Sequence, residues 1–249
     1  MLTGWIIMKF NTYLDNKKTL KLIHDTSIRE VILEHKTLSR MGRLDTDSLL
    51  SLTDAALESG LSPVLQWDTL CTESKFENCI KLLDDLPLSK FAAIRVQDIG
   101  AAEWVRNELP EIPIHFIAET GNHNLTGLMR WHKYFGQQLQ RFALSSELPI
   151  STLINYCRSL TVPCEILAAG RILLFYTPRK LLGNYESSKK SFDFMEKILV
   201  PSDQPQRQFR TLENQHGTFM YHHKDLFLLD FIPELQKINL NVLLSLIHI

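Results

Sequence analysis

Carboxylate side chains stand where short apolar runs of this sequence end. Glu34 ends the run Arg29–Glu34, Glu119 follows the run Ile112–Ala118, and Glu147 follows the run Arg141–Leu144. Carboxyl groups that meet at one end of a sheet can act as acid and base or hold a metal ion. We therefore predict these three glutamates as catalytic candidates. A purely structural role is the alternative. Other polar residues at such run ends are His35, Gln66, Asp68, Gln97 and Asp98.

Asp98 has a second interpretation because it directly precedes Ile99-Gly100-Ala101, at the start of a helical stretch. Asp is among the residues preferred at this position, where its side chain accepts a hydrogen bond from a free backbone N–H. We predict Asp98 as a helix cap.

Two arginines flank the aromatic and apolar stretch Ile172–Tyr176. They are Arg171 and Arg179. A guanidinium at the mouth of a site suits a phosphate or carboxylate ligand. A solvated loop position is the alternative for each.

Several chemistries leave no motif here. The sequence holds no H-E-x-x-H, no G-x-S-x-G and no P-loop pattern, so zinc-protease and serine-hydrolase signals are absent. Its four cysteines form no C-x-x-C pair. Buried, reduced thiols are the simplest interpretation, because free cysteine packs like a small apolar side chain.

Short apolar runs alternate with amphipathic stretches along the whole chain. Thr46–Glu58 is one such stretch, with leucines at three- and four-residue spacing, Asp45 or Thr46 as its cap and Gly60 after its end. The other predicted helices are Glu73–Leu83, Ala101–Leu109, Leu125–Phe135 and Ser151–Leu160. The predicted strands are Trp5–Phe10, Arg29–Glu34, Pro63–Trp67, Phe91–Val96, Ile112–Ala118, Arg141–Leu144, Cys164–Ala168 and Asn241–Ile247.

This alternation predicts an α/β fold with parallel strands covered by helices. Eight strands favour a (β/α)8 TIM-type barrel. An open doubly wound sheet is the alternative, but the glycine-rich first turn usual in that fold is missing. We predict a single barrel domain over residues 1–249. Residues 171–225 would form an inserted module between strands 7 and 8, and the last outer helix would be absent.

Composition sets broad limits on partners and location. Lys and Arg number 27 against 28 Asp and Glu, which gives a net charge of −1 and argues against a strong global attraction to nucleic acid or anionic membrane. A local basic patch remains compatible with that balance. The longest apolar run is far shorter than the ~20 residues of a membrane span. We expect a cytoplasmic protein with no membrane span.

Segments such as Pro163-Cys164-Glu165-Ile166 and Glu213-Asn214-Gln215-His216-Gly217-Thr218 resemble motifs of the collagenase-like peptidase family, class U-32. The family motif H-G-x-x-C aligns here with Ala169-Gly170-Arg171-Ile172-Leu173. The loop and helix that follow the second strand in the family are similar to Glu34–Arg43 and Thr46–Leu49. The motif segments are Pro163-Cys164-Glu165-Ile166, Tyr176-Thr177-Pro178-Arg179-Lys180-Leu181-Leu182-Gly183-Asn184-Tyr185, Glu213-Asn214-Gln215-His216-Gly217-Thr218 and Lys224-Asp225-Leu226.

The resemblance implies a barrel with an inserted module. It also implies a role in hydroxylating RNA or a ubiquinone precursor, since members of the family support such reactions despite the peptidase label. By the same resemblance, the substrate-binding candidates are Arg40, Arg43, Tyr176, Arg179, His216, Lys224 and Asp225.

Those family members hold an iron–sulfur cluster on four cysteines, and this chain departs from them. The histidine and cysteine of H-G-x-x-C are lost, and the G-R-C step is here Pro178-Arg179-Lys180. Cys164 would lie at the opposite end of the barrel from the site, and Cys71 has no predicted thiol partner. We expect no iron–sulfur cluster, no other cofactor and no metal.

Three functions remain open. The first is a divergent U-32 member that acts in or alongside hydroxylation of RNA or of a ubiquinone precursor, with RNA or a quinone-like molecule as ligand. The second is a catalytically inactive barrel that binds a protein partner, or a second copy of itself, through its uncovered last strand. Proteolysis is the third.

Overall fold

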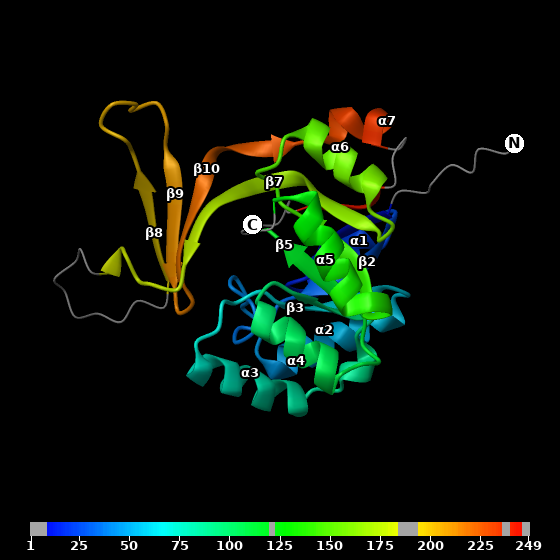
Figure 1. Cartoon of the computed structure of the whole chain (residues 1–249). Helices are drawn as coiled ribbons and strands as arrows, with labels where there is room; N and C mark the ends of the chain where they lie inside the picture. Colours follow the sequence, from blue (N-terminus) through cyan, green and yellow to red (C-terminus); the bar gives the residue numbers. More distant parts are fainter. Residues whose placement is uncertain (1–8, 120–122, 184–193, 236–239, 246–249) are drawn as a thin grey trace, which may run out of the picture.

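The structure is a computed structural model that describes residues 9–119, 123–183, 194–235 and 240–245 (Figure 1). Eight parallel strands of this described part form a closed barrel. β11 closes it by pairing with both β1 and β7, so that Leu243 stands opposite Phe10 on one side and Ile166 on the other. This closure confirms the TIM-type barrel and excludes the open sheet. The barrel strands are β1 (Lys9–Tyr13), β2 (Ile28–Leu33), β3 (Ser62–Trp67), β4 (Ala93–Val96), β5 (Ile114–Ala118), β6 (Leu139–Leu144), β7 (Cys164–Thr177) and β11 (Leu240–Ser245).

Helices follow the first six strands and pack on the outside of the barrel. α2 and α5 have the predicted bounds, and Asp45 caps α2 by accepting a hydrogen bond of 2.9 Å from the Ser48 N–H. Asp98 caps α4 in the same way, with Ala101 N–H as donor, as predicted. The helices are α1 (Lys17–Ile23), α2 (Thr46–Glu58), α3 (Glu73–Asp84), α4 (Ile99–Glu108), α5 (Leu125–Phe135), α6 (Ile150–Ser159) and the short α7 (Ile232–Leu235).

The first strand continues further along the chain than predicted. The prediction was Trp5–Phe10, but β1 covers Lys9–Tyr13, and residues 5–8 of the predicted strand lie outside the described part. β1 carries the polar residues Asn11 and Thr12, and both are buried. The amide of Asn11 donates a hydrogen bond to Glu165 across the barrel. Buried polar side chains therefore form part of the barrel interior at β1, so a search for apolar residues alone does not find the end of this strand.

β7 continues well beyond the predicted Ala168 and links the barrel to a second sheet. Its first half pairs with β6 and β11, and its second half, from Ala169 to Thr177, pairs antiparallel with β10. The order of this sheet is β7-β10-β9-β8, and it stands beside the barrel in Figure 1. Its other strands are β8 (Phe194–Leu199), β9 (Phe209–Asn214) and β10 (Gly217–Phe227).

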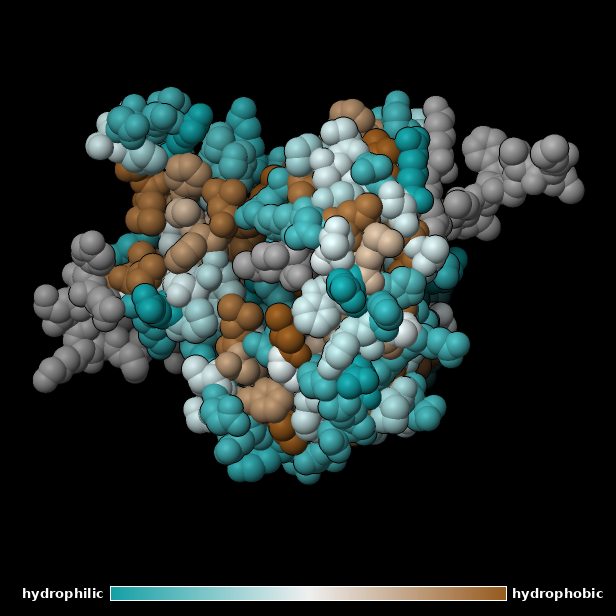
Figure 2. All heavy atoms as spheres, in the orientation of Figure 1, coloured by the Kyte–Doolittle hydropathy of each residue, from teal (hydrophilic) through white to brown (hydrophobic). Residues whose placement is uncertain are grey.

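The second sheet carries exposed apolar side chains, which gather over it in Figure 2. They include Leu174, Phe175, Phe194, Ile198, Leu199 and Phe227. No helix in the described ranges is long and apolar enough to cross a membrane.

The turn between β9 and β10 depends on Gly217. Its φ is 129°, and a Cβ at this position would lie 2.0 Å from the carbonyl oxygen of Thr177. Gly60 also has a positive φ, of 71°, but nothing lies within 4 Å of its ideal Cβ. An alanine at Gly60 would therefore suffer backbone strain alone, whereas an alanine at Gly217 would suffer both backbone strain and steric overlap.

We expect Gly217→Ala to lower the free energy of unfolding by about 3 kcal/mol, and Gly60→Ala by about 1 kcal/mol. Urea unfolding followed by circular dichroism measures both. Equal losses in the two variants would show that the close approach of Gly217 to Thr177 is not a constraint.

Candidate functional site at the carboxyl ends of the barrel strands

A cavity of about 110 Å³ opens at the carboxyl ends of the barrel strands. This end is where barrels of this type carry their sites. Its wall includes apolar side chains such as Ile117, Leu167 and Phe219. Its charged and hydrogen-bonding wall residues include Tyr13, Glu34, Arg40, Gln66, Asp68, Arg95, Glu119, Glu165 and Arg171.

Arg40 and Asp68 form the buried ion pair at the centre of this wall. Arg40 Nε donates to Asp68 Oδ2 at 2.8 Å, and the Arg40 backbone N–H donates to Asp68 Oδ1 at 2.7 Å. Arg40 Nη2 donates to Glu119 Oε2 at 2.9 Å. The pair fixes the β2–α2 loop against the ends of β3 and β5.

The second sheet holds Arg40 from the other side. Asn214, at the end of β9, donates a hydrogen bond of 2.8 Å to the Arg40 carbonyl oxygen. The Tyr176 ring lies 5.3 Å from the Arg40 guanidinium, within the range of a cation–π contact, and stacks on Phe219 at 4.8 Å. The sheet therefore completes the site and does not merely project from it.

Glu34 lies beside this pair and keeps its proton at neutral pH. Burial and the nearby Asp68 carboxylate raise the pKa of Glu34 to about 8. The Gln66 amide joins the two acids, donating to Glu34 Oε1 at 3.1 Å and to Asp68 Oδ2 at 3.0 Å. The Tyr13 hydroxyl donates to the Gln66 carbonyl oxygen at 3.3 Å. The Gln66 amide thus holds the Glu34 and Asp68 carboxyl groups side by side.

Below the cavity, a charged network fills the barrel. Arg95 and Arg141 both donate hydrogen bonds to Glu165, and Arg141 also donates to Glu30 at 2.5 and 2.9 Å. Burial opposes the ionisation of Glu30, but the hydrogen bond from Arg141 lowers its pKa to about 2. Burial likewise opposes ionisation of Glu165, and the positive charges of Arg95 and Arg141 outweigh it and lower the pKa. Every member is ionised and paired.

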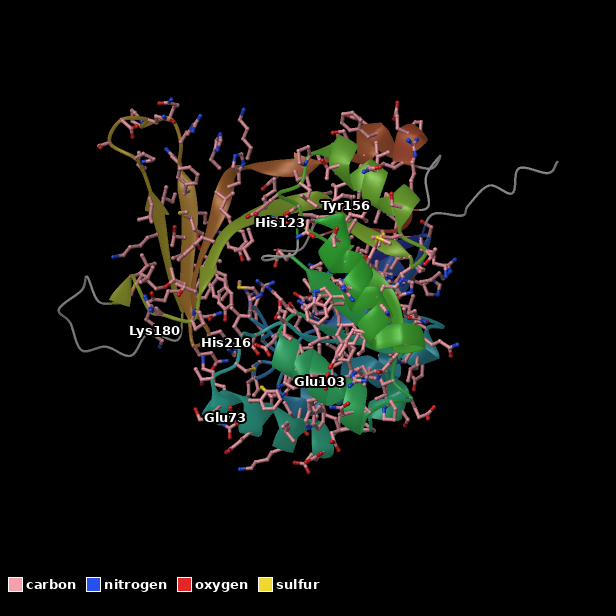
Figure 3. The ribbon with its side chains drawn as sticks, in the orientation of Figure 1. Glu73, Glu103, His123, Tyr156, Lys180 and His216 are labelled. Atoms are coloured by element: carbon pink, nitrogen blue, oxygen red, sulfur yellow. The ribbon has the colours of Figure 1, made fainter. Side chains whose placement is uncertain are left out.

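The three predicted catalytic glutamates do not all lie together. Glu34 and Glu119 line the cavity, but Glu147 does not. Glu147 lies 3.5 Å from His123 in a neighbouring depression that Glu119 and Tyr176 also line. The Tyr156 hydroxyl donates to the His123 carbonyl oxygen, and Figure 3 shows both residues together. Glu147 lies further out in the loop beyond β6, whereas Glu34 and Glu119 directly follow the last residues of β2 and β5.

The predicted binding residues are also divided. Arg40 lines the cavity, and the Tyr176 ring contacts the Arg40 guanidinium but does not line the cavity, while Arg43 lines an adjoining depression with Glu34. His216 is buried outside the cavity, where its Nε2 lies 2.7 Å from the Lys36 carbonyl oxygen and ties the β9–β10 turn to the β2–α2 loop (Figure 3). The remaining three, Arg179, Lys224 and Asp225, are exposed and do not line the cavity.

Three cavity residues escaped the sequence prediction. Arg95, Glu165 and Tyr13 lie on barrel strands, and the two charged ones stand within runs of apolar residues. A lone charge inside a short apolar strand is a usable signal, since such a charge is seldom buried without a partner. Charges of opposite sign on different strands of a closed barrel then point to a shared network.

The four cysteines do not fit a four-cysteine iron–sulfur cluster. Cys71 lies beside Cys79, which corrects the expectation that it has no thiol neighbour. Cys164 lies beside Cys157, at the amino end of β7 and therefore at the other end of the barrel, as predicted. A four-cysteine cluster needs its thiolates in one place. In the described ranges, no three His, Cys, Asp or Glu side chains form a metal-binding group.

Replacement of Glu34 tests its raised pKa. The folded protein holds the Glu34 proton up to about pH 8, while the unfolded chain releases it near the ordinary value of 4.5. Between these values the unfolded chain binds fewer protons, so Glu34 makes the free energy of unfolding fall as pH rises. Glu34→Gln removes this dependence. We expect the variant to be more stable than the wild type at pH 8 by more than about 2 kcal/mol, and the gain to shrink toward pH 4.5.

Urea unfolding across this pH range measures the effect, and other titrating groups contribute equally to both proteins. Glu147→Gln is the matched control, because Glu147 is half exposed, and its curve should follow the wild type. A constant offset between Glu34→Gln and the wild type would contradict the assignment.

Comparison with known proteins agrees with the motif resemblance. The model of the family described as Peptidase family U32 matches residues 16–244. The tRNA hydroxylation protein P2 of Bacillus subtilis (strain 168) is 24% identical over 136 residues, which cover 52% of this chain and 43% of that protein. The matched part thus spans less than half of this curated relative. A solved structure described as that of the U32 peptidase Mk0906 is 12% identical, with a TM-score of 0.49, over 69% of this chain and 73% of that one. Because the family match extends over most of its length, this chain belongs to peptidase family U32.

Proposed function

We propose that this chain acts in or alongside the hydroxylation of transfer RNA, with the cavity at the carboxyl ends of the barrel strands as its functional site. The observation that carries the proposal is the similarity to a family member named as a tRNA hydroxylation protein. The part of the chain that matches the family includes Glu34, Arg40, Asp68 and Glu119.

The cavity offers acid–base chemistry but not the histidine- or cysteine-based pair of a serine or cysteine protease. Glu34 can give a proton, and Asp68 can accept one, at positions joined by the Gln66 amide. None of the described residues that line the cavity is histidine or cysteine. The nucleophile and base pair of a serine or cysteine protease is therefore not formed in this cavity.

Exposed cations near the cavity suit an RNA backbone. Lys36 is exposed next to the β9–β10 turn, since its carbonyl oxygen accepts from His216. Arg179 is also exposed, next to the start of β10, where its carbonyl oxygen accepts a hydrogen bond from the Thr218 hydroxyl. Phosphate contacts position an RNA without reading its sequence, and such local cations can do this despite a net charge of −1.

Deletion of the gene in its source organism tests the function. We expect the hydroxylated nucleoside to disappear from digested transfer RNA, as measured by mass spectrometry, and wild-type protein to restore it. Glu34→Gln should fail to restore it although the variant stays folded, because the acid is lost. Glu147→Gln should restore it, because its carboxyl group lies outside the cavity.

The same experiment separates the alternatives. Loss of ubiquinone with unchanged transfer RNA would favour a quinone precursor as substrate. Full restoration by Glu34→Gln would make the chain a non-catalytic subunit, a role for which the exposed apolar side chains of the second sheet offer a surface. Unchanged transfer RNA and unchanged ubiquinone would contradict hydroxylation altogether.

The absence of an iron–sulfur cluster is part of the proposal, and it rests on the separation of the two cysteine pairs. We expect protein purified without oxygen to be colourless and to contain no stoichiometric iron or acid-labile sulfide. A brown, cluster-loaded protein would contradict this, and Cys71→Ser would then show whether the thiols near the cavity hold the cluster.

A further inference from the structure

Three arginines of the cavity wall each keep one buried nitrogen without a hydrogen-bond partner among the described protein atoms. These nitrogens are Arg40 Nη1, Arg95 Nε and Arg171 Nη1. A buried donor without a partner costs about 1–3 kcal/mol, and more when it is charged. Three such donors around one cavity indicate a ligand that accepts hydrogen bonds.

Hydrogen bonds to carboxylates hold two of these guanidinium groups in place, those of Arg40 and Arg95. Arg40 is held by Asp68 and Glu119, and Arg95 by Glu165. Arg171 Nε lies 4.0 Å from Asp225. The three come from the β2–α2 loop, β4 and β7, so they approach the cavity from different sides.

The charges of the wall favour a ligand with one negative charge over a ligand with two. The three arginines face three carboxylates, of Asp68, Glu119 and Glu165. Glu34 is protonated at neutral pH and adds no charge. One carboxylate can be accommodated by the free guanidinium nitrogens, but a dianion would meet the repulsion of three fixed carboxylates.

The volume of the cavity and the apolar part of its wall limit the size and the polarity of the rest of the ligand. The cavity of about 110 Å³ is smaller than the cavity of about 150 Å³ that holds benzene in an engineered protein. Ile117, Leu167 and Leu173 supply apolar surface beside the arginines. A short hydrocarbon body fits this space.

We propose that the cavity binds a small monocarboxylate, with its carboxylate oxygens accepting hydrogen bonds from Arg40 Nη1 and Arg171 Nη1 and its apolar body against Ile117, Leu167 and Leu173. The proposal deepens the function given above and rests on it for the view that this cavity is the functional site. The bound acid would be a co-substrate or an effector that lies between the cavity floor and the RNA.

Titration calorimetry with propanoate and its neutral analogue propanamide tests the charge requirement, and butanoate and benzoate test the size. We expect the carboxylates to bind and each matched amide to bind at least about tenfold more weakly, as loss of a charge-assisted hydrogen bond predicts. Arg171→Gln should weaken carboxylate binding about tenfold. Arg171 is suited to this test because its side chain is 27% exposed and its ion pair with Asp225 is long, so the variant should fold.

Arg158→Gln is the control, since Arg158 is an exposed arginine on α6 outside the cavity, and it should bind as the wild type does. The proposal is overturned if no carboxylate binds more tightly than its amide, if the control loses as much affinity as Arg171→Gln, or if inorganic phosphate binds better than every monocarboxylate. Calorimetry needs no RNA. Carboxylate binding without transfer RNA hydroxylation in the cell would therefore reject the function alone, and the reverse result would reject this inference alone.

Discussion

The buried pair of Arg40 and Asp68 is the interaction on which the site depends. Arg40 meets Asp68 through its side chain and its backbone, reaches Glu119 on a third element, and is held by Asn214 and Tyr176 of the second sheet. A charge this deeply buried is stable only when it is paired and hydrogen-bonded. Arg40 therefore couples the positions of four parts of the structure, which are the β2–α2 loop, the ends of β3 and β5, and the second sheet.

The charged interior extends this constraint through the barrel. Barrels of this type usually fill their interior with layers of branched apolar side chains. Here Glu30, Arg141, Glu165 and Arg95 occupy that space, and their mutual hydrogen bonds offset the cost of removing them from water. Removing one member would leave an unpaired buried charge. Such a network contributes little net stability, but it holds Arg95 at the cavity floor.

The sequence was a good guide to the barrel and a partial one to the site. Repeated alternation of strand and helix signals predicted the fold, and strong local patterns gave the bounds of α2 and α5, because these depend on neighbouring residues alone. The end of β1 at Tyr13 was missed because its polar side chains pair with residues far away in the chain, as Asn11 does with Glu165. Glu34 and Glu119 could be predicted because each directly follows an apolar run. Arg95 and Glu165 could be recognised only from the closed barrel, because their partners lie on other strands.

The length of β7 explains how the second sheet takes part in the site. A strand that ended at Ala168 would close the barrel and contribute nothing beyond its rim. Because β7 continues to Thr177, the same strand carries Glu165 on the cavity floor, Arg171 and Leu173 on its wall, and Tyr176 above Arg40. Pairing with β10 keeps the projecting half of β7 extended. The cavity is thus built along one strand, and the second sheet supports the part of that strand which the barrel cannot hold.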